Sequence, residues 1–148
     1  MFEIIPPKTG LKSRPVGAGE VAISVRRGPA HRGHVLTFSM GQDLAIALDW
    51  RDGTKVVVAW GRDKALGKVK IGPAVGDGPN WEVRGNKARD VFKVYTGALP
   101  ETFSGELYSG KRVVHEVIKT AATEPAPYLV VTLPKGFHED LVRAMAHA

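Results

Sequence analysis

The sequence predicts a mainly β protein: a small β barrel with one short helix, followed by a β-rich C-terminal half and a short terminal helix. Three observations support this fold class. Apolar and polar residues alternate in several short segments, which is the two-residue period of a half-buried strand. Glycine, proline and charged residues separate these segments from one another. Apolar residues at helical spacing occur in two stretches, and both stretches are short.

The N-terminal sequence predicts an extended arm followed by a strand. Residues 1–20 hold so many prolines and glycines that a long helix is excluded, and we expect an extended arm there. From Val21 onward, Val21, Ile23 and Val25 alternate with alanine, serine and arginine, as in a strand that buries one side. A basic loop broken by glycine and proline follows, and residues 35–38 resume the strand pattern.

A short helix is expected after the second strand. Ser39 is followed three residues later by Gln42, the spacing of a capping box, in which each side chain satisfies a free backbone N–H at the helix start. The helix is therefore predicted to begin at about Met40. Apolar residues within 44–48 lie on one face of it, and an Asp-Gly pair at residues 52–53 predicts a turn directly afterwards.

A β-hairpin and a linker are expected next. The β-branched run at residues 55–60 and the alternating residues 68–71 predict two strands joined by a seven-residue connection. A segment rich in glycine and proline follows and has the composition of a linker. The predicted organisation after the arm is therefore a β domain at residues 21–73, a linker at residues 74–80 and an extension at residues 81–148.

The extension predicts four further strands and a terminal helix. β-Branched and aromatic runs bounded by chain-breaking residues place the strands at residues 81–83, 91–95, 113–119 and 128–133. After a proline and a glycine, apolar residues return at helical spacing. They predict a helix within residues 137–148 that carries Phe137, Leu141, Val142 and Met145.

Composition favours an acidic partner. The chain carries 21 Lys and Arg against 15 Asp and Glu, which gives a net charge of +6 and a pI near 9.7. Because the 148 residues include no cysteine, disulfides, thiolate nucleophiles and cysteine-ligated metal centres are excluded. The sequence shows no signal-peptide pattern and no apolar run of the ~18 residues that a spanning helix needs, so we expect a cytoplasmic protein with no membrane partner.

The order of elements within residues 21–73 resembles the AbrB/MazE/SpoVT family of swapped-hairpin DNA-binding domains. In that family an alternating strand leads into a short helix, a Gly-Asp pair and a valine-rich hairpin. The corresponding segments of this chain are residues 36–38 for the strand, 43–48 for the helix, Gly53-Thr54 for the pair, and 56–58 with 69–71 for the hairpin. The resemblance implies a swapped-hairpin-like barrel.

The resemblance further implies an intimate homodimer and a DNA-binding surface. Each subunit's hairpins would interleave with those of its partner, because a lone subunit would expose half of its core. Arginines near the first strand and its loop would face duplex DNA. By position these are Arg26, Arg27 and Arg32, with His31, His34 and Lys55 as weaker candidates. Arginine suits this role because its planar fork can meet a phosphate or a guanine edge with two hydrogen bonds.

We therefore expect a non-enzymatic DNA-binding protein, either a transcriptional regulator or an antitoxin-like factor. No nucleophile or acid–base constellation can be assembled, and no cofactor or metal is expected. His31 and His34 lie three residues apart, but no third ligand is near them. The glycines in residues 61–69 lack the spacing of a phosphate loop, and valine replaces its Ser or Thr.

Two alternatives stay open. The basic loop can be a solvated surface, in which case the chain is a β-rich interaction or structural protein of bacterial or viral origin, with a protein partner at its C-terminal half. Aromatic residues can also form a stacking platform for single-stranded nucleic acid, although such residues more often belong to a core. They are Phe38, Trp50, Trp60, Trp81, Phe92 and Tyr95.

Overall fold

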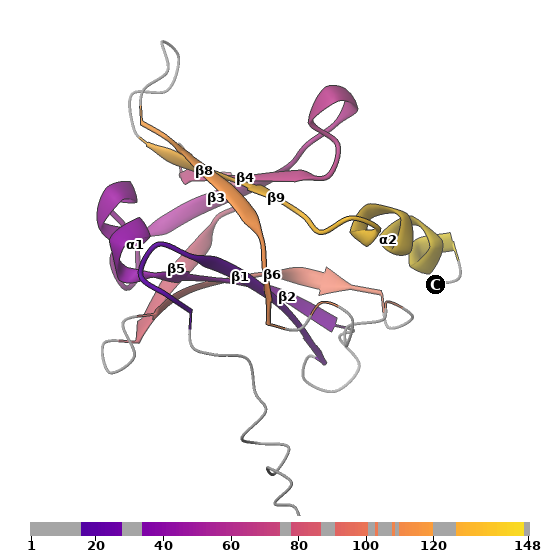
Figure 1. Ribbon diagram of the computed structural model, residues 1–148, viewed down its shortest axis with the longest axis horizontal. Helices are drawn as coiled ribbons and strands as arrows, with labels where there is room; N and C mark the ends of the chain where they lie inside the picture. Colours follow the sequence, from indigo (N-terminus) through magenta and orange to yellow (C-terminus); the bar gives the residue numbers. More distant parts are fainter. Residues whose placement is uncertain are drawn as a thin grey trace, which may run out of the picture.

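The computed structural model of the chain describes residues 16–27, 34–74, 78–86, 91–100, 103, 108, 110–119 and 127–146. Most of the predicted arm and the basic loop at residues 28–33 lie outside the described residues. Within the described ranges a nine-stranded antiparallel sheet curls into a nearly closed barrel that carries two α-helices (Figure 1). The predicted mainly β class is confirmed, as are the short helix and the short terminal helix.

The strands, in chain order, are β1 (Val21–Arg27), β2 (His34–Gly41), β3 (Lys55–Trp60), β4 (Lys68–Pro73), β5 (Trp81–Asn86), β6 (Val91–Leu99), β7 (Lys111–Arg112), β8 (Val114–Ile118) and β9 (Tyr128–Thr132). Helix α1 (Gln42–Leu48) follows β2, and α2 (Phe137–Ala146) follows β9. A 3₁₀ turn, η2 (Asp63–Ala65), lies in the connection between β3 and β4. Every strand that the alternation predicts is present in the structure.

The barrel closes within one chain. The strand order is β7-β1-β2-β6-β5-β3-β4-β9-β8, and all neighbouring strands are antiparallel. Val113 alone separates β7 from β8, so one segment pairs with β1 at one end and with β9 at the other. The Val113 N–H also donates to the Val21 carbonyl oxygen at 3.0 Å. The first and last strands of the order therefore belong to a single segment, which closes the sheet.

The connectivity has an approximate two-fold pattern. The unit β1-β2-α1 recurs as β8-β9-α2, and the hairpin β3-β4 corresponds to the hairpin β5-β6. β2 pairs with β6, and β9 pairs with β4 in the same way. In the sheet, pairs of strands from residues 21–73 therefore alternate with pairs of strands from residues 81–148. The predicted domain and the predicted extension share one sheet.

Alternation along the strands places apolar side chains inside the barrel, as predicted. Ile23 on β1 pairs with Phe38 on β2, and Phe38 pairs in turn with Val94 on β6. Val94 pairs with Val83 on β5, and all four side chains are 0% exposed. Burying a side chain of this size stabilises the fold by about 1.5–3 kcal/mol relative to leaving it in water. The inner faces of neighbouring strands thus form one continuous core.

The predicted start of α1 is wrong by two residues. Ser39 remains in β2, where it pairs with Ala22 of β1 and Lys93 of β6. The first helical residue is Gln42, and the N-cap residue Gly41 makes no side-chain cap hydrogen bond. The capping box does not form because strand pairing on both sides holds Ser39 in the sheet.

The backbone before β1 caps α1 instead. The amides of Asp43 and Leu44 both donate to the Ala18 carbonyl oxygen, at 3.0 and 3.3 Å. These bonds satisfy two of the free N–H groups at the helix start. The capping segment passes so close that a Cβ at position 41 would lie 2.1 Å from the Gly17 carbonyl oxygen. Glycine is therefore required at position 41.

Helix α2 is present where the sequence predicts it, but its buried face differs from the predicted apolar set. Phe137 is 0% exposed, Ala144 is buried, and Leu141 packs against the core. Residues spaced by four and then three positions share one face of a helix, and this face covers the barrel. Val142 and Met145 lie outside it, because they are 51% and 62% exposed.

An aromatic cluster attaches α2 to the barrel. The ring centroid of Phe137 lies 4.9 Å from that of Phe103 and 4.9 Å from that of Tyr108. The Tyr108 hydroxyl also donates a hydrogen bond to the carboxylate of Asp140 on α2. Burial, this hydrogen bond and the negative charges of Asp140 and Glu139 together raise the pKa of Tyr108 to about 12.

The substitution Tyr108→Phe is expected to change the pH dependence of stability in the alkaline range. The pKa of Tyr108 is higher in the folded chain than its ordinary value of 10.0. The neutral hydroxyl therefore stabilises the fold fully below about pH 10, and this contribution is lost as the pH rises through about 12. Thermal melts from pH 9 to pH 12 should show a wild-type advantage that disappears toward pH 12. An advantage independent of pH would contradict this assignment.

Candidate nucleic-acid interface

The structure places the predicted DNA-binding arginines at the loop end of the β1-β2 hairpin. Arg26 and Arg27 are the last residues of β1, where their backbones pair with Val35 and His34 at the start of β2. The structure does not describe the side chains of Arg26, Arg27 and His34. Arg32 and His31 lie wholly outside the described residues.

Lys55 lies apart from that hairpin end. It is exposed at the start of β3 and pairs with Glu82 of β5. The sheet order β2-β6-β5-β3 puts two strands between Lys55 and the hairpin that carries the arginines. The structure therefore does not bring Lys55 beside Arg26 and Arg27, although the resemblance implies that all three face DNA.

The outer side of β5 and β6 carries a compact set of polar and aromatic side chains. Lys93 on β6 pairs with Arg84 on β5, and Tyr95 lies two residues further along β6. Tyr95 is 48% exposed, whereas the intervening Val94 is 0% exposed, so Lys93 and Tyr95 share the outer side. We call this surface the outer β5-β6 face, and it consists of Lys55, Glu82, Arg84, Lys93 and Tyr95.

Positive charge predominates on the outer β5-β6 face, since it has three cations and one carboxylate. Arg84 Nη2 lies 2.9 Å from Glu82 Oε2, and the two side chains are 61% and 41% exposed. An ion pair this exposed contributes only about 0–1 kcal/mol, so a phosphate can replace Glu82 as the partner of Arg84. Among the described residues, no carboxylate lies within ion-pair distance of Lys55 or Lys93.

Polar residues of β1 and β2 lie between this face and the end of the first hairpin. Thr37 of β2 pairs with Tyr95, and Ser39 of β2 pairs with Lys93. Ser24 of β1 pairs with Thr37 on the other side. Figure 1 shows β1, β2, β5 and β6 in the same layer of the barrel. Thr37 and Ser39 are only 6% and 7% exposed, so their hydroxyl groups do not form an exposed surface between the outer β5-β6 face and the strand that ends in Arg26 and Arg27.

Sequence reasoning missed Lys93 and Arg84 as candidates. The signal for Lys93 and Tyr95 was present, because both alternate with apolar residues in the run that predicts β6. Arg84 could not be found in this way, since its place beside Lys93 depends on which strands pair.

The described residues hold no group of three or more histidine, cysteine, aspartate or glutamate side chains that could bind a metal ion.

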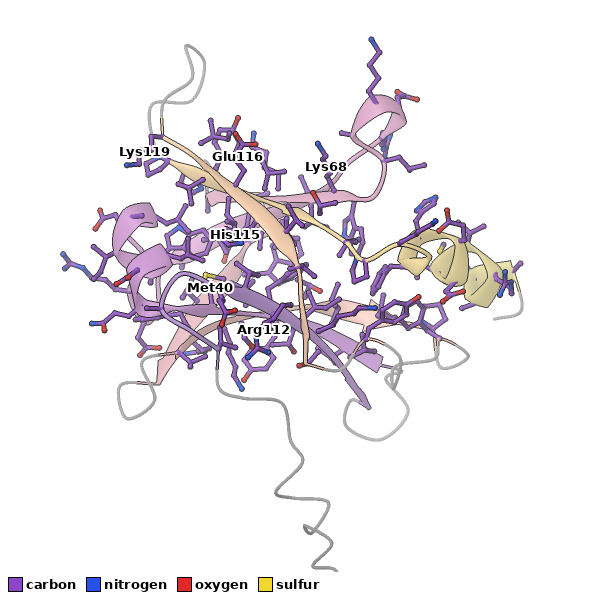
Figure 2. The ribbon with its side chains drawn as sticks, in the orientation of Figure 1. Met40, Lys68, Arg112, His115, Glu116 and Lys119 are labelled. Carbon is purple, nitrogen blue, oxygen red and sulfur yellow. The ribbon has the colours of Figure 1, made fainter. Side chains whose placement is uncertain are left out.

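Residues 61–67 form the connection of the hairpin β3-β4, as predicted. His115 of β8 pairs with Val131 of β9 and is half-buried (Figure 2). These are the surroundings of an ordinary strand residue. In these ranges no helix is long and apolar enough to cross a membrane.

The predicted aromatic platform does not form one surface. Phe38 and Trp50 are 0% and 4% exposed and belong to the core. Trp60 and Tyr95 are exposed, but they lie on β3 and β6, which β5 separates in the sheet. Tyr95 is therefore the aromatic residue that accompanies the cations of the outer β5-β6 face.

Comparisons of the chain with protein-family models, with curated proteins and with solved structures found no match.

Proposed function

We propose that this protein binds duplex DNA as a transcriptional regulator or antitoxin-like factor. The observation that carries the proposal is the outer β5-β6 face, where Lys93 and Arg84 pair across neighbouring strands beside the exposed Tyr95. Arg26 and Arg27 end β1, which β2 alone separates from β6. Together they supply cations for phosphates and a ring for apolar contact with DNA.

The spacing of the cations suits a phosphate backbone. Lys93, Arg84 and Lys55 lie on the successive strands β6, β5 and β3. Neighbouring strands are about 4.8 Å apart, so the three cations span roughly 10 Å across the sheet. One DNA strand advances about 3.4 Å per phosphate along the helix axis, so this width covers about three steps between successive phosphates.

A homodimer is part of the proposal, on a different basis from the one that the resemblance implies. A lone subunit does not expose half of a core here, because one chain supplies every strand of the nearly closed sheet. Two copies would instead join two basic surfaces on one duplex and raise the overall affinity. Sedimentation with and without DNA tests this part separately. A monomer in both conditions would remove the dimer and leave DNA binding to its own test.

DNA binding is tested by fluorescence-anisotropy titration of a labelled duplex at several salt concentrations. The slope of log affinity against log salt should be about −0.9 for each neutralised phosphate. The double variant Arg84→Gln, Lys93→Gln should bind more weakly and flatten the slope by up to about 1.8. The variant Arg26→Ala, Arg27→Ala, Arg32→Ala tests the hairpin end in the same way.

A matched control removes the same charge elsewhere. Lys64 and Lys119 are exposed and lie outside the outer β5-β6 face. Their replacement by glutamine should leave the salt slope unchanged. Wild-type binding that is absent or insensitive to salt would rule out the proposal. Equal losses in the control and in the Arg84, Lys93 variant would remove the outer β5-β6 face from it.

The alternative function is protein interaction, and the exposed apolar residues favour it. Val114 is 73% exposed on β8, and Val142 and Met145 are exposed on α2. Exposed apolar side chains of this size fit a surface that a protein partner covers. This alternative replaces the DNA proposal if the titration gives no salt-dependent binding.

A further inference from the structure

A cavity of about 270 Å³ lies between the connection of the hairpin β3-β4 and helix α2. The two elements lie next to each other at one end of the barrel (Figure 1). The apolar part of the lining comprises Trp60, Leu66, Leu133, Phe137 and Leu141. Three basic side chains, Arg62, Lys68 and His138, complete it. The cavity shares no residue with the outer β5-β6 face.

Backbone hydrogen bonds fix the walls of the cavity. The Leu133 N–H donates to the Gly67 carbonyl oxygen at 2.8 Å, which ties the segment before α2 to the connection. The Gly61 N–H donates to the Lys68 carbonyl oxygen at 2.8 Å. A Cβ at position 61 would lie 1.9 Å from the Ala65 carbonyl oxygen, so glycine permits this compact turn. The cavity is therefore formed before a ligand binds, as is usual for small-molecule sites.

The aromatic part of the lining combines a rigid side with an accessible side. Phe137 is 0% exposed and is held by the ring contacts with Phe103 and Tyr108. Trp60 and Leu66 are 43% and 53% exposed, although both line the cavity. The indole ring of Trp60 offers a flat apolar surface, and a ligand ring that removes this surface and Leu66 from water gains binding free energy.

The basic part of the lining lacks matching negative charge. Arg62 and Lys68 are exposed, and in the described ranges no carboxylate lies within ion-pair distance of either. Figure 2 shows Lys68 at the start of β4, beside the connection. Their charges lie next to an apolar cavity, and a carboxylate on the ligand would complement both of them.

We infer that this cavity binds a small aromatic carboxylate. Its ring system lies against the apolar lining, and its carboxylate accepts hydrogen bonds from Arg62 and Lys68. The volume of about 270 Å³ lies just below the about 300–1,000 Å³ that is usual for ligand sites, which favours one or two rings over a nucleotide. The site does not depend on DNA binding, because different residues form it.

The test uses 2-naphthoate and its neutral analogue 2-naphthalenemethanol, titrated into the full chain by calorimetry. We expect saturable binding of 2-naphthoate with a Kd below about 1 mM, as its number of atoms permits. The variant Arg62→Gln, Lys68→Gln should bind 2-naphthoate about tenfold more weakly and the neutral analogue as wild type does. Trp60→Ala should weaken the binding of both compounds.

The double variant Arg84→Gln, Lys93→Gln is the matched control and should bind 2-naphthoate as wild type does. Arg62 and Lys68 are exposed, so their variant should keep the wild-type melting temperature. Absence of saturable wild-type binding at several millimolar would overturn the inference. An unchanged affinity for 2-naphthoate in the Arg62, Lys68 variant would overturn it as well. Neither result bears on DNA binding.

Discussion

Replacement of Phe137 by alanine is expected to lower the free energy of unfolding by about 3–5 kcal/mol. The side chain is 0% exposed at the start of α2, and its ring contacts those of Phe103 and Tyr108. Alanine would remove these contacts and leave a cavity between α2 and the barrel. Because a whole domain is stable by only about 5–15 kcal/mol, this loss is large. Urea denaturation followed by circular dichroism measures it.

Val142→Ala is the control on the same helix. Val142 is 51% exposed, so its replacement should change the free energy of unfolding by no more than about 0.5 kcal/mol. A loss of similar size in both variants would contradict the assignment of the buried face of α2. The sequence pattern alone places both residues in one apolar set, and this comparison separates them.

The second large effect is expected from Val113→Pro, which removes the N–H that donates to the Val21 carbonyl oxygen. Val113 lies between β7 and β8, where one segment joins β1 to β9. Proline there deletes a hydrogen bond of the closing segment and restricts the backbone in the middle of it. We expect a loss of about 1–3 kcal/mol in the free energy of unfolding, because the Val21 carbonyl oxygen is left without this hydrogen bond.

Val113→Ala separates the backbone effect from the side-chain effect. Alanine shortens the side chain and keeps the N–H, so the difference between the two variants reports the closing hydrogen bond and backbone fit. Urea denaturation of both variants under one set of conditions gives this difference. Equal stability of the proline and alanine variants would mean that the segment at residues 111–118 does not close the barrel.

Local patterns in the sequence were sufficient to locate most elements. The strands β1 to β6, β8 and β9 overlap the runs of alternating or β-branched residues that predict them. The connection at residues 61–67 and the turn at Asp52 and Gly53 were predicted from residue types alone, and Gly53 has a φ of +88°. These features depend on neighbours in the chain, which a single sequence displays directly.

Contacts between distant segments could not be predicted. The sequence gives no sign that β2 pairs with β6, so the sharing of one sheet by both halves was not foreseen. Ser39 and Gln42 have the spacing of a capping box, but the carbonyl oxygen of Ala18 caps α1. Likewise the hydrogen bond from Tyr108 to Asp140 joins residues 32 positions apart.

The candidate site was predictable to a smaller extent than the fold. The net charge indicated a polyanionic partner. The clustered arginines predicted a binding surface at the loop end of the β1-β2 hairpin. Lys93 and Tyr95 share a face by simple alternation, but a lysine and a tyrosine on one strand are too common to indicate a site. Only the pairing of β5 with β6 brings Arg84 beside Lys93.

Amide chemical-shift changes during a titration of the labelled protein with duplex DNA test the proposed interface most directly. We expect the largest changes at Arg84, Lys93 and Tyr95, with further changes toward Arg26 and Arg27 at the end of β1. Amides of β8 and β9, which lie in the other layer of the barrel (Figure 1), should change little. Changes concentrated on β8 and β9, with none on β5 and β6, would contradict DNA binding at the outer β5-β6 face.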